Sequence, residues 1–269
     1  MRKLTQRDHE KVWPFIQKEA SKNLFIIGDI EVYGYEQDFQ ELWGAFDAEE
    51  NLTVILLRYY ESFIVYGVKD YDVLSVVAIM KDYNPAVISG SKEVLKRLES
   101  FLPSNVYSRR DTFFAECTKE SLDISDKLEN NKKVKIATLE DALRIARLEN
   151  QIVEFESVKK ISLVEREKQI RKKLESKAGR TYFIENGNEI VSAVSTTAEN
   201  SVSAMIMGVC TKKEFRKQGF VSVILPILLK DLFKEKETAC LFYDNPKAGD
   251  IYKRNGFKDV GIWRMLIRK

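Results

Sequence analysis

The fold of the second half of this chain is decided by the stretch 208–222, which reads Gly-Val-Cys-Thr-Lys-Lys-Glu-Phe-Arg-Lys-Gln-Gly-Phe-Val-Ser. A β-strand pattern ends at its start, a short basic loop follows, and Gly219 stands where a long apolar helix is predicted to begin. The first turn of a helix has N–H groups without intrahelical partners and a partial positive charge, so it can hold a phosphate. Gly219 lets the backbone approach a ligand closely, and Arg216 and Lys217 add positive charge. The pattern predicts an anion site, although a plain basic loop with a glycine before a helix would look the same.

The residues around this loop predict a mixed α/β layer structure. Helical periodicity covers 139–149, 164–174, 219–234 and 248–255, and strand patterns cover 181–184, 190–197, 201–210, 238–243 and 260–267. Asn186-Gly187 favours a tight hairpin turn between the first two of these strands. Helices and strands in this order predict helices packed on one mixed sheet, an α+β or α/β fold.

The first half has strand patterns at 52–59, 63–66, 73–80, 86–88 and 111–117, and a helical pattern at 92–101. The polar stretch 119–133 separates the two halves and is typical of a linker. We therefore predict an N-terminal domain at 1–120, a linker at 121–133 and a second domain at 134–269. Both halves open with a hydroxyl residue three positions before a carboxylate, Thr5 with Asp8 and Thr138 with Asp141, which is close to a capping box. Two such starts are compatible with a duplicated unit.

Composition excludes several classes of protein. The chain has 269 residues, and 44 basic minus 41 acidic residues gives a net charge of +3, too small an excess to call for a nucleic-acid partner. The opening residues lack the apolar core of a signal peptide, and the longest apolar run, at 220–229, is far short of the ~20 residues that span a bilayer. Three scattered cysteines favour neither a disulfide framework nor a metal site. These features predict a soluble, cytoplasmic protein without a membrane partner.

Residues after the loop resemble those of a known superfamily. The next strand leads into Asn245, followed by Ala248, Tyr252, Gly256 and Phe257. Together with Arg216, Gly219 and Val221, these positions resemble the acyl-CoA motif (Arg/Gln-x-x-Gly-x-Gly/Ala) and the later Asn-x-x-Ala-x-x-x-Tyr pattern of the GCN5-related N-acetyltransferases (GNAT). The resemblance covers 134–269. The first half looks similar to the degenerate amino-terminal half of tandem acetyltransferases and of glycine N-acyltransferase-like proteins.

The resemblance implies the GNAT fold, in two tandem domains of which the first is degenerate, and it implies acetyl-CoA as cosubstrate without a metal. Backbone amides of the loop and first helical turn would hold the CoA diphosphate. The end of the preceding strand would pair with the pantetheine arm, and the N–H of Val209 or Cys210 would polarise the thioester carbonyl. Asn245 would bond near the same arm, and Tyr252 would protonate the leaving thiolate. The residues expected to contact acetyl-CoA are Gly208, Val209, Cys210, Arg216, Lys217, Gln218, Gly219, Phe220, Val221, Ser222, Asn245, Ala248 and Tyr252.

Two departures from the family pattern bear on function. Val221 stands where the motif has a small residue, and the strand 201–210 lacks the Glu that serves many relatives as general base. Asp244 and Glu199 are the catalytic candidates besides Tyr252, and Glu154, Glu156 or a water chain are further alternatives for the base. Each of these carboxylates could equally be an ordinary surface charge. Cys210 is expected to pack in the strand rather than to act as a nucleophile, since no histidine follows it.

The resulting prediction is an enzyme that moves an acetyl group from acetyl-CoA to a primary amine by direct attack. The acceptor is expected to be a small-molecule or peptide amine. The sequence is compatible with a homodimer. The alternative is a CoA-binding sensor or scaffold of the same fold without efficient transfer. The first half has no Arg-x-x-Gly loop, so we expect it to bind no CoA and to shape the acceptor side instead.

Overall fold

The structure is a computed structural model that describes residues 1–68, 70–103, 105–122, 134–158 and 161–269. It divides into two compact units. Unit 1 holds Met1–Ala115, Phe242–Asp244 and Asp259–Lys269, and unit 2 holds Glu116–Leu241 and Asn245–Lys258. The predicted domain ranges 1–120 and 134–269 remain predictions, and the compact units differ from them chiefly because the last strand belongs with unit 1. Most of the predicted linker, 123–133, lies outside the described residues.

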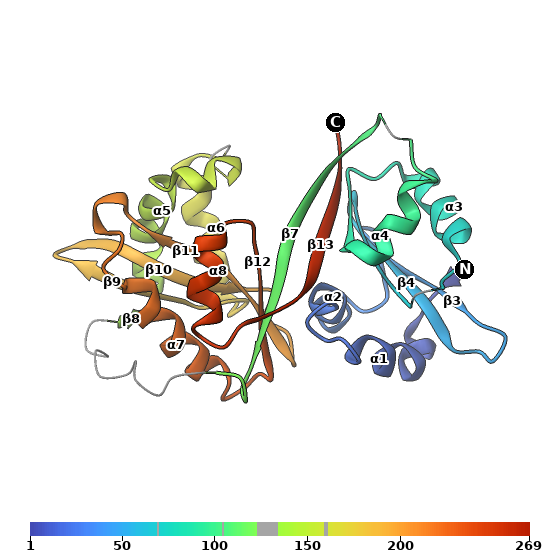
Figure 1. Ribbon diagram of the computed structural model, residues 1–269, viewed down its shortest axis with the longest axis horizontal. Helices are drawn as coiled ribbons and strands as arrows, with labels where there is room; N and C mark the ends of the chain where they lie inside the picture. Colours follow the sequence, from blue (N-terminus) through green and yellow to red (C-terminus); the bar gives the residue numbers. More distant parts are fainter. Residues whose placement is uncertain (69, 104, 123–133, 159–160) are drawn as a thin grey trace. The chain divides into compact units, whose positions relative to one another are not determined.

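The two halves of the chain run through nearly the same order of elements (Figure 1). The first half consists of β1 (Arg2–Lys3), α1 (His9–Gln17), α2 (Leu24–Tyr33), β2 (Glu36–Gln37), β3 (Gln40–Phe46), β4 (Leu52–Tyr59), β5 (Ser62–Gly67), α3 (Val73–Tyr83), β6 (Val87–Ser91), α4 (Lys92–Glu99) and β7 (Tyr107–Thr118). The second consists of β8 (Val134–Ile136), α5 (Ala142–Asn150), α6 (Leu163–Glu175), β9 (Thr181–Asn186), β10 (Glu189–Thr197), β11 (Ser203–Thr211), α7 (Phe220–Leu232), β12 (Thr238–Tyr243), α8 (Pro246–Lys253) and β13 (Lys258–Arg268). Apart from β2, each element has a counterpart in the other half.

The repeat extends to local detail. Both predicted capping boxes form: the Thr5 N–H donates to Asp8 Oδ2 at 2.8 Å, and the Thr138 N–H donates to Asp141 Oδ2 at 3.0 Å. Each half also has one parallel strand pair joined by a crossover helix, β5–α3–β6 in the first and β11–α7–β12 in the second. The shared order of elements supports the duplication suggested by the sequence.

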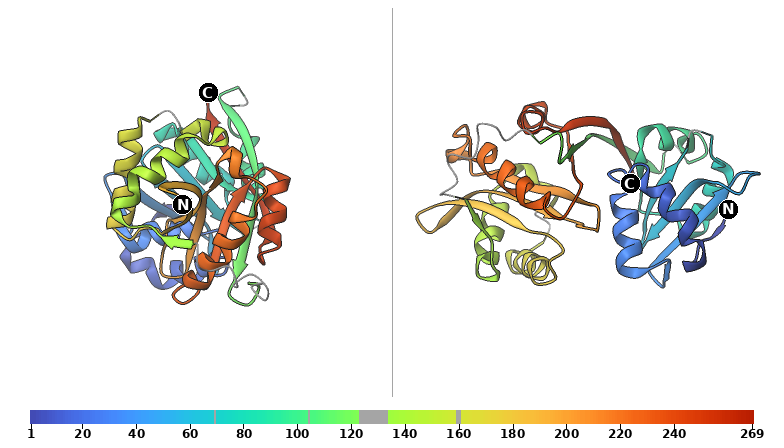
Figure 2. Two further views of the ribbon diagram at one scale, coloured as in Figure 1. Left: turned by 90° about the vertical axis from the view of Figure 1, so that its left-hand side faces the viewer. Right: turned by 90° about the horizontal axis from the view of Figure 1, so that it is seen from below.

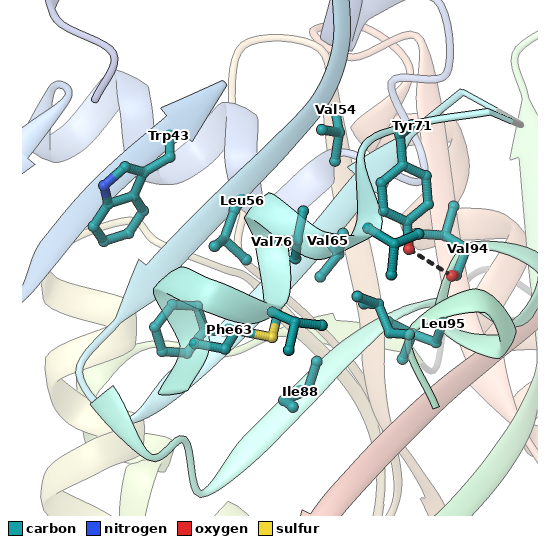
Figure 3. Packing of buried hydrophobic residues seen from close by; sticks show 14 of the residues in the cluster. Trp43, Val54, Leu56, Phe63, Val65, Tyr71, Val76, Ile88, Val94 and Leu95 are labelled. Atoms are coloured by element: carbon teal, nitrogen blue, oxygen red, sulfur yellow. Dashed lines mark hydrogen bonds between the residues drawn. The ribbon is translucent and has the colours of Figure 1, made fainter. Parts of the chain in front are cut away.

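Unit 1 is a mixed sheet with helices on both faces. Its strand order is β1-β3-β4-β5-β6-β13-β7, with β2 added to β3. Successive residues of β4 point to opposite faces: Ile55 and Leu57 pack with α1 and α2, and Val54 and Leu56 pack with α3 and α4. Figure 3 shows the second of these cores, in which the Tyr71 hydroxyl donates to the Val94 carbonyl at 2.9 Å.

The prediction of a strand at 73–80 is wrong, because this segment is the helix α3. Its β-branched residues suggested a strand, but the buried positions Val73, Val76, Val77 and Met80 follow a helical period. Asp72 caps the helix by accepting from the Ser75 N–H at 3.1 Å. Burial of one face against the sheet outweighs the weak intrinsic preference of valine for strands.

The last strand, β13, pairs with the first half of the chain. Its residues 263–267 run antiparallel to β6, with Trp263 opposite Ser91 and Ile267 opposite Val87. Arg264 is almost fully buried and donates to both carboxylate oxygens of Asp111 at 2.7 Å and to Glu99 at 2.6 Å. A fragment beginning at Val134 would therefore carry β13 without its partner strand, so functional tests should use the full chain.

Unit 2 is a second helix-covered sheet, with the strand order β12-β11-β10-β9-β8. Its α5 and α6 (yellow-green) lie on one face, and α7 and α8 (orange to red) lie on the other (Figure 2). The predicted hairpin turn forms between β9 and β10, with Gly187 at φ +61°. Because both faces are covered, nearly every residue of β10 is buried.

A buried carboxyl in unit 1 gives a pH-dependent prediction. Burial raises the pKa of Asp29, on α2, from its ordinary value of 3.8 to about 7. Between these values the folded state binds more protons than the unfolded state, so ionisation of Asp29 lowers stability as the pH rises through this window. We expect Asp29→Asn to remove this loss. The free energy of unfolding of the variant, relative to that of the wild type, should therefore increase by about 2 kcal/mol from pH 5 to pH 7.

The measurement is urea unfolding at the two pH values, followed by tryptophan fluorescence, since all three tryptophans lie in unit 1. Other titrating groups are common to the variant and the wild type and cancel in the comparison. Parallel pH dependence of the two proteins would show that Asp29 titrates normally in the folded state.

Candidate active site

The predicted anion loop lies between β11 and α7 and has an unusual backbone. Lys217 and Gly219 both adopt left-handed conformations, at φ +65° and +79°. The first helical hydrogen bond runs from the Val223 N–H to the Gly219 carbonyl at 3.2 Å, so the N–H groups of 220–222 have no partner within the helix. A Cβ on Gly219 would meet no atom within 4 Å, so the space over the loop is open. These donors and this space fit a diphosphate.

Arg216 is held in place at the start of this loop. Its guanidinium donates to both carboxylate oxygens of Glu154, at 2.9 and 3.0 Å, and to the Thr211 carbonyl at 3.1 Å. The side chains of Arg216, Lys217 and Gln218 are exposed, whereas Phe220, Val221 and Ser222 are half-buried. Arg216 therefore fixes the loop to the end of β11, and a bound anion would compete with Glu154 for its charge.

The strand before the loop carries a bulge at the predicted pantetheine site. Cys210 lies opposite Ala193 on β10 and Met207 lies opposite Ser195, so Gly208 and Val209 together face a single residue of β10. Gly208 is at φ +60°, a conformation that glycine adopts without strain. Residues 203–205 of β11 pair in parallel with β12, and they precede the bulge in the sequence. The bulge interrupts regular pairing where the thioester is expected to lie.

The predicted residues after β12 belong to α8. Asn245 caps this helix, its Oδ1 accepting from the Lys247 N–H at 3.0 Å, and Ala248 is half-buried in the first turn. Tyr252 is buried with 8% of its surface exposed, and its ring meets Phe257 edge to face. Burial raises the pKa of Tyr252 to about 12, so the phenol stays protonated at neutral pH.

The carboxylates considered as bases are mostly engaged elsewhere. Glu199 is nearly buried and accepts from Arg180 through both oxygens, at 2.8 and 3.0 Å. Asp244 is exposed, belongs to unit 1, and pairs with Arg110 at 3.3 Å. Glu154 is bound to Arg216, and the side chain of Glu156 lies outside the described residues. Two of these carboxylates, Glu199 and Glu154, are therefore held in ion pairs with arginines.

One carboxylate at the bulge was missed by the sequence analysis. Glu149, at the end of α5, places Oε1 3.7 Å from where a Cβ on Gly208 would lie. A signal for it exists in the sequence: the buried residues Ala142, Ile145 and Ala146 define an apolar helix face, and position 149 continues that face. A carboxylate on an apolar stripe is a candidate functional group.

Cysteine chemistry does not contribute to this site. All three thiols are free and buried, and burial raises the pKa of Cys210 above its ordinary value. Cys210 packs in the core beneath α5, as predicted. Among the described residues no three His, Cys, Asp or Glu side chains gather in a way that could hold a metal ion. No helix in the described ranges has the length and apolarity needed to cross a bilayer.

A bulged strand leads through a loop that ends in the left-handed Gly219 into an apolar helix, within a mixed helix-covered sheet, and this is the arrangement expected for the GNAT fold. The GNAT acetyltransferase family model matches residues 30–266. The chain therefore belongs to the GNAT acetyltransferase family. No curated protein matches the chain.

Solved structures share this fold over nearly the whole chain. A GCN5-related N-acetyltransferase from Sphaerobacter thermophilus has a TM-score of 0.61 at 12% identity, covering 100% of this chain and 94% of its own. A GCN5-related N-acetyltransferase from Kribbella flavida has a TM-score of 0.60 at 14% identity, covering 90% and 94%. A tandem GNAT protein from the clavulanic acid biosynthesis pathway has a TM-score of 0.56 at 10% identity, covering 98% and 96%. At these sequence identities the similarity shows the fold alone. The match to a tandem GNAT protein is consistent with the repeated order of elements in this chain.

Proposed function

We propose that this protein transfers an acetyl group from acetyl-CoA to a primary amine by direct attack. The observation that carries the proposal is the backbone of 216–222 in a chain of this family. Two left-handed residues and the first-turn N–H groups of α7, which have no partner within the helix, border an open space suited to a diphosphate. The acceptor is a small-molecule or peptide amine.

The chain's own groups supply the steps of the reaction. Amides of 219–222 bind the diphosphate and thereby fix the thioester relative to β11. Backbone groups of the bulge, at Gly208–Cys210, align the pantetheine arm, and an N–H there stabilises charge on the thioester oxygen. The phenol of Tyr252 donates to the departing thiolate as the amine forms its bond to the acyl carbon.

Unit 1 is proposed to hold no CoA. The counterpart of the diphosphate loop precedes α3, and there the Asp72 side chain accepts from the Ser75 N–H. This carboxylate satisfies a first-turn donor and would repel a diphosphate. Charge and hydrogen bonding therefore both favour a single CoA site per chain.

The role of Tyr252 can be tested by removing its hydroxyl. We expect Tyr252→Phe to lower kcat about 100-fold, because general acid assistance is lost, while the Kd for CoA stays unchanged. The measurement is release of free thiol from acetyl-CoA with a panel of primary amines. Tyr60→Phe is the control, since Tyr60 is 61% exposed in unit 1 and should leave turnover as in the wild type.

The same assay separates the enzyme from the sensor alternative. Acceleration of thiol release by an amine supports transfer. If CoA binds and raises the melting temperature, but no amine accelerates thiol release, the protein is a sensor or scaffold of this fold. Equal turnover of Tyr252→Phe and the wild type would exclude Tyr252 as the acid.

A further inference from the structure

Glu149 occupies a position that packing alone does not explain. It lies on the face of α5 whose other members, Ala142, Ile145 and Ala146, are buried in an apolar core with Ala193 and Cys210. Its side chain is 16% exposed. An ionisable side chain is costly to bury in such surroundings, so its retention there calls for a partner or a function.

The carboxylate of Glu149 is directed at the strand bulge. Oε1 lies 3.7 Å from the Cβ position of Gly208, and Ser195 Oγ lies 3.5 Å from the same point. Gly208 has no side chain, so no side-chain atom of this residue lies between the Glu149 carboxylate and the backbone of the bulge. Two polar oxygens from α5 and β10 thus meet at the one place where β11 departs from regular pairing.

The charged groups around Glu149 come from α6. Arg166 is 3% exposed; its Nη1 lies 3.4 Å from Glu149 Oε2, and its Nε donates to Asn150 Oδ1 at 2.9 Å. Lys173 also faces Glu149 and donates to Thr181 Oγ1 at 3.4 Å. From β11, the thiol of Cys210 is the remaining titratable neighbour.

These neighbours have opposing effects on protonation. Burial raises the pKa of Glu149, and the charges of Lys173 and Arg166 partly offset this. A carboxylate whose pKa lies above the ordinary glutamate value is a better proton acceptor near neutral pH than a solvated one. Arg166 Nη1 lies within hydrogen-bond distance of Oε2, while Oε1 is the oxygen nearest the Cβ position of Gly208.

We propose that Glu149 is the general base of the transfer reaction, taking a proton from the acceptor ammonium beside Gly208, with Arg166 as its positioning residue. The inference rests on the proposed function, because it places the thioester at the same bulge. It supplies the base that the strand 203–211 lacks in its own sequence, Ser-Ala-Met-Ile-Met-Gly-Val-Cys-Thr.

The proton balance is complete without any further reactant. An ammonium acceptor gives one proton to Glu149, and the neutral amine then forms its C–N bond to the acyl carbon. The C–S bond breaks as the nitrogen loses a second proton, and the thiolate gains one from Tyr252. The phenol is restored by the proton that leaves nitrogen, and Glu149 returns its proton to water.

The test compares acceptors that do and do not need a base. With an alkylamine, which is protonated at neutral pH, we expect Glu149→Gln to lower kcat/KM about 100-fold, and with methoxyamine, which is uncharged there, by less than about threefold. The acidic limb of the wild-type pH profile should disappear in Glu149→Gln and persist in Glu149→Asp. Glu175→Gln, an exposed glutamate at the end of α6, is the control and should match the wild type.

The outcomes distinguish the two proposals. An active wild type whose Glu149→Gln variant slows both acceptors equally, or keeps the acidic limb, would show a structural ion pair and overturn the inference alone. A wild type that transfers to neither acceptor while binding CoA would overturn the proposed function and this inference with it. The Kd for CoA and the melting temperature, measured on each variant, show whether the fold and the cosubstrate site are intact.

Discussion

Replacing Gly219 by valine is expected to weaken CoA binding by about a thousandfold. Gly219 is at φ +79°, where a β-branched residue is strained by roughly 1–2 kcal/mol. Relief of that strain turns the peptide groups of the loop away from the diphosphate, and each charge-assisted hydrogen bond lost costs about 1.5–3 kcal/mol. The valine side chain also enters the open space above the loop. The combined loss is about 4 kcal/mol, which corresponds to the thousandfold change.

The hairpin glycine of unit 2 provides a matched control. Gly187 is also left-handed, at φ +61°, and also has no atom within 4 Å of its Cβ position, but it lies in the turn between β9 and β10. We therefore expect Gly187→Val to lower the free energy of unfolding about as much as Gly219→Val does, and to leave the Kd for CoA unchanged. Calorimetric titration of both variants with CoA makes the comparison. Equal Kd values for the two would contradict the assignment of 216–222 as the diphosphate loop.

Replacing Gly256 by alanine is expected to destabilise the protein by about 4 kcal/mol, among the larger effects of a single substitution. The added Cβ would lie 2.0 Å from the Ser121 carbonyl oxygen and 2.7 Å from its carbon. Both are backbone atoms, so the clash can be relieved only by moving a chain segment. Gly256 is in addition at φ +94°, where alanine is strained. The position thus requires glycine for packing, independently of any ligand.

The measurement for Gly256→Ala is the free energy of unfolding in urea, followed by far-UV circular dichroism. Gly187→Ala serves as the reference, because it carries the backbone strain without a steric clash. The excess destabilisation of Gly256→Ala over this reference reports the contact with Ser121. If the two variants unfold at the same urea concentration, the close approach of the two segments is wrong.

Local patterns predicted much of unit 2. The strand prediction at 238–243 coincides with β12, and the helix predicted at 164–174 differs from α6 by one residue at each end. The Asn186-Gly187 turn and both capping boxes also form as predicted. Each of these features depends on residues close together in the sequence, which is why periodicity and turn chemistry were enough.

Features that depend on distant residues were not predictable in this way. The segment 73–80 has the composition of a strand, and only the burial of one side against the sheet makes it α3. The pairing of β13 with β6 joins residues that are far apart in the chain, and nothing in the local pattern of 260–267 distinguishes one partner strand from another. Long-range strand pairing of this kind is decided by the tertiary structure.

The candidate site shows the same division. Arg216, Gly219 and Tyr252 could be named in advance because the motif fixes their spacing, whereas the bulge at Gly208 and the approach of Glu149 to it arise from the packing of α5 on the sheet. Glu199 and Glu154 were reasonable candidates from charge alone. Their ion pairs with Arg180 and Arg216 are visible only in three dimensions.

Calorimetric titration of the wild-type full chain with CoA tests whether the amides of 219–222 hold the diphosphate of a CoA thioester. We expect saturable binding at one site per chain, since the first-turn N–H groups of α7 have no partner within the helix and the counterpart before α3 is capped by Asp72. A titration that shows no heat of binding up to millimolar CoA, with the protein folded, would contradict the claim.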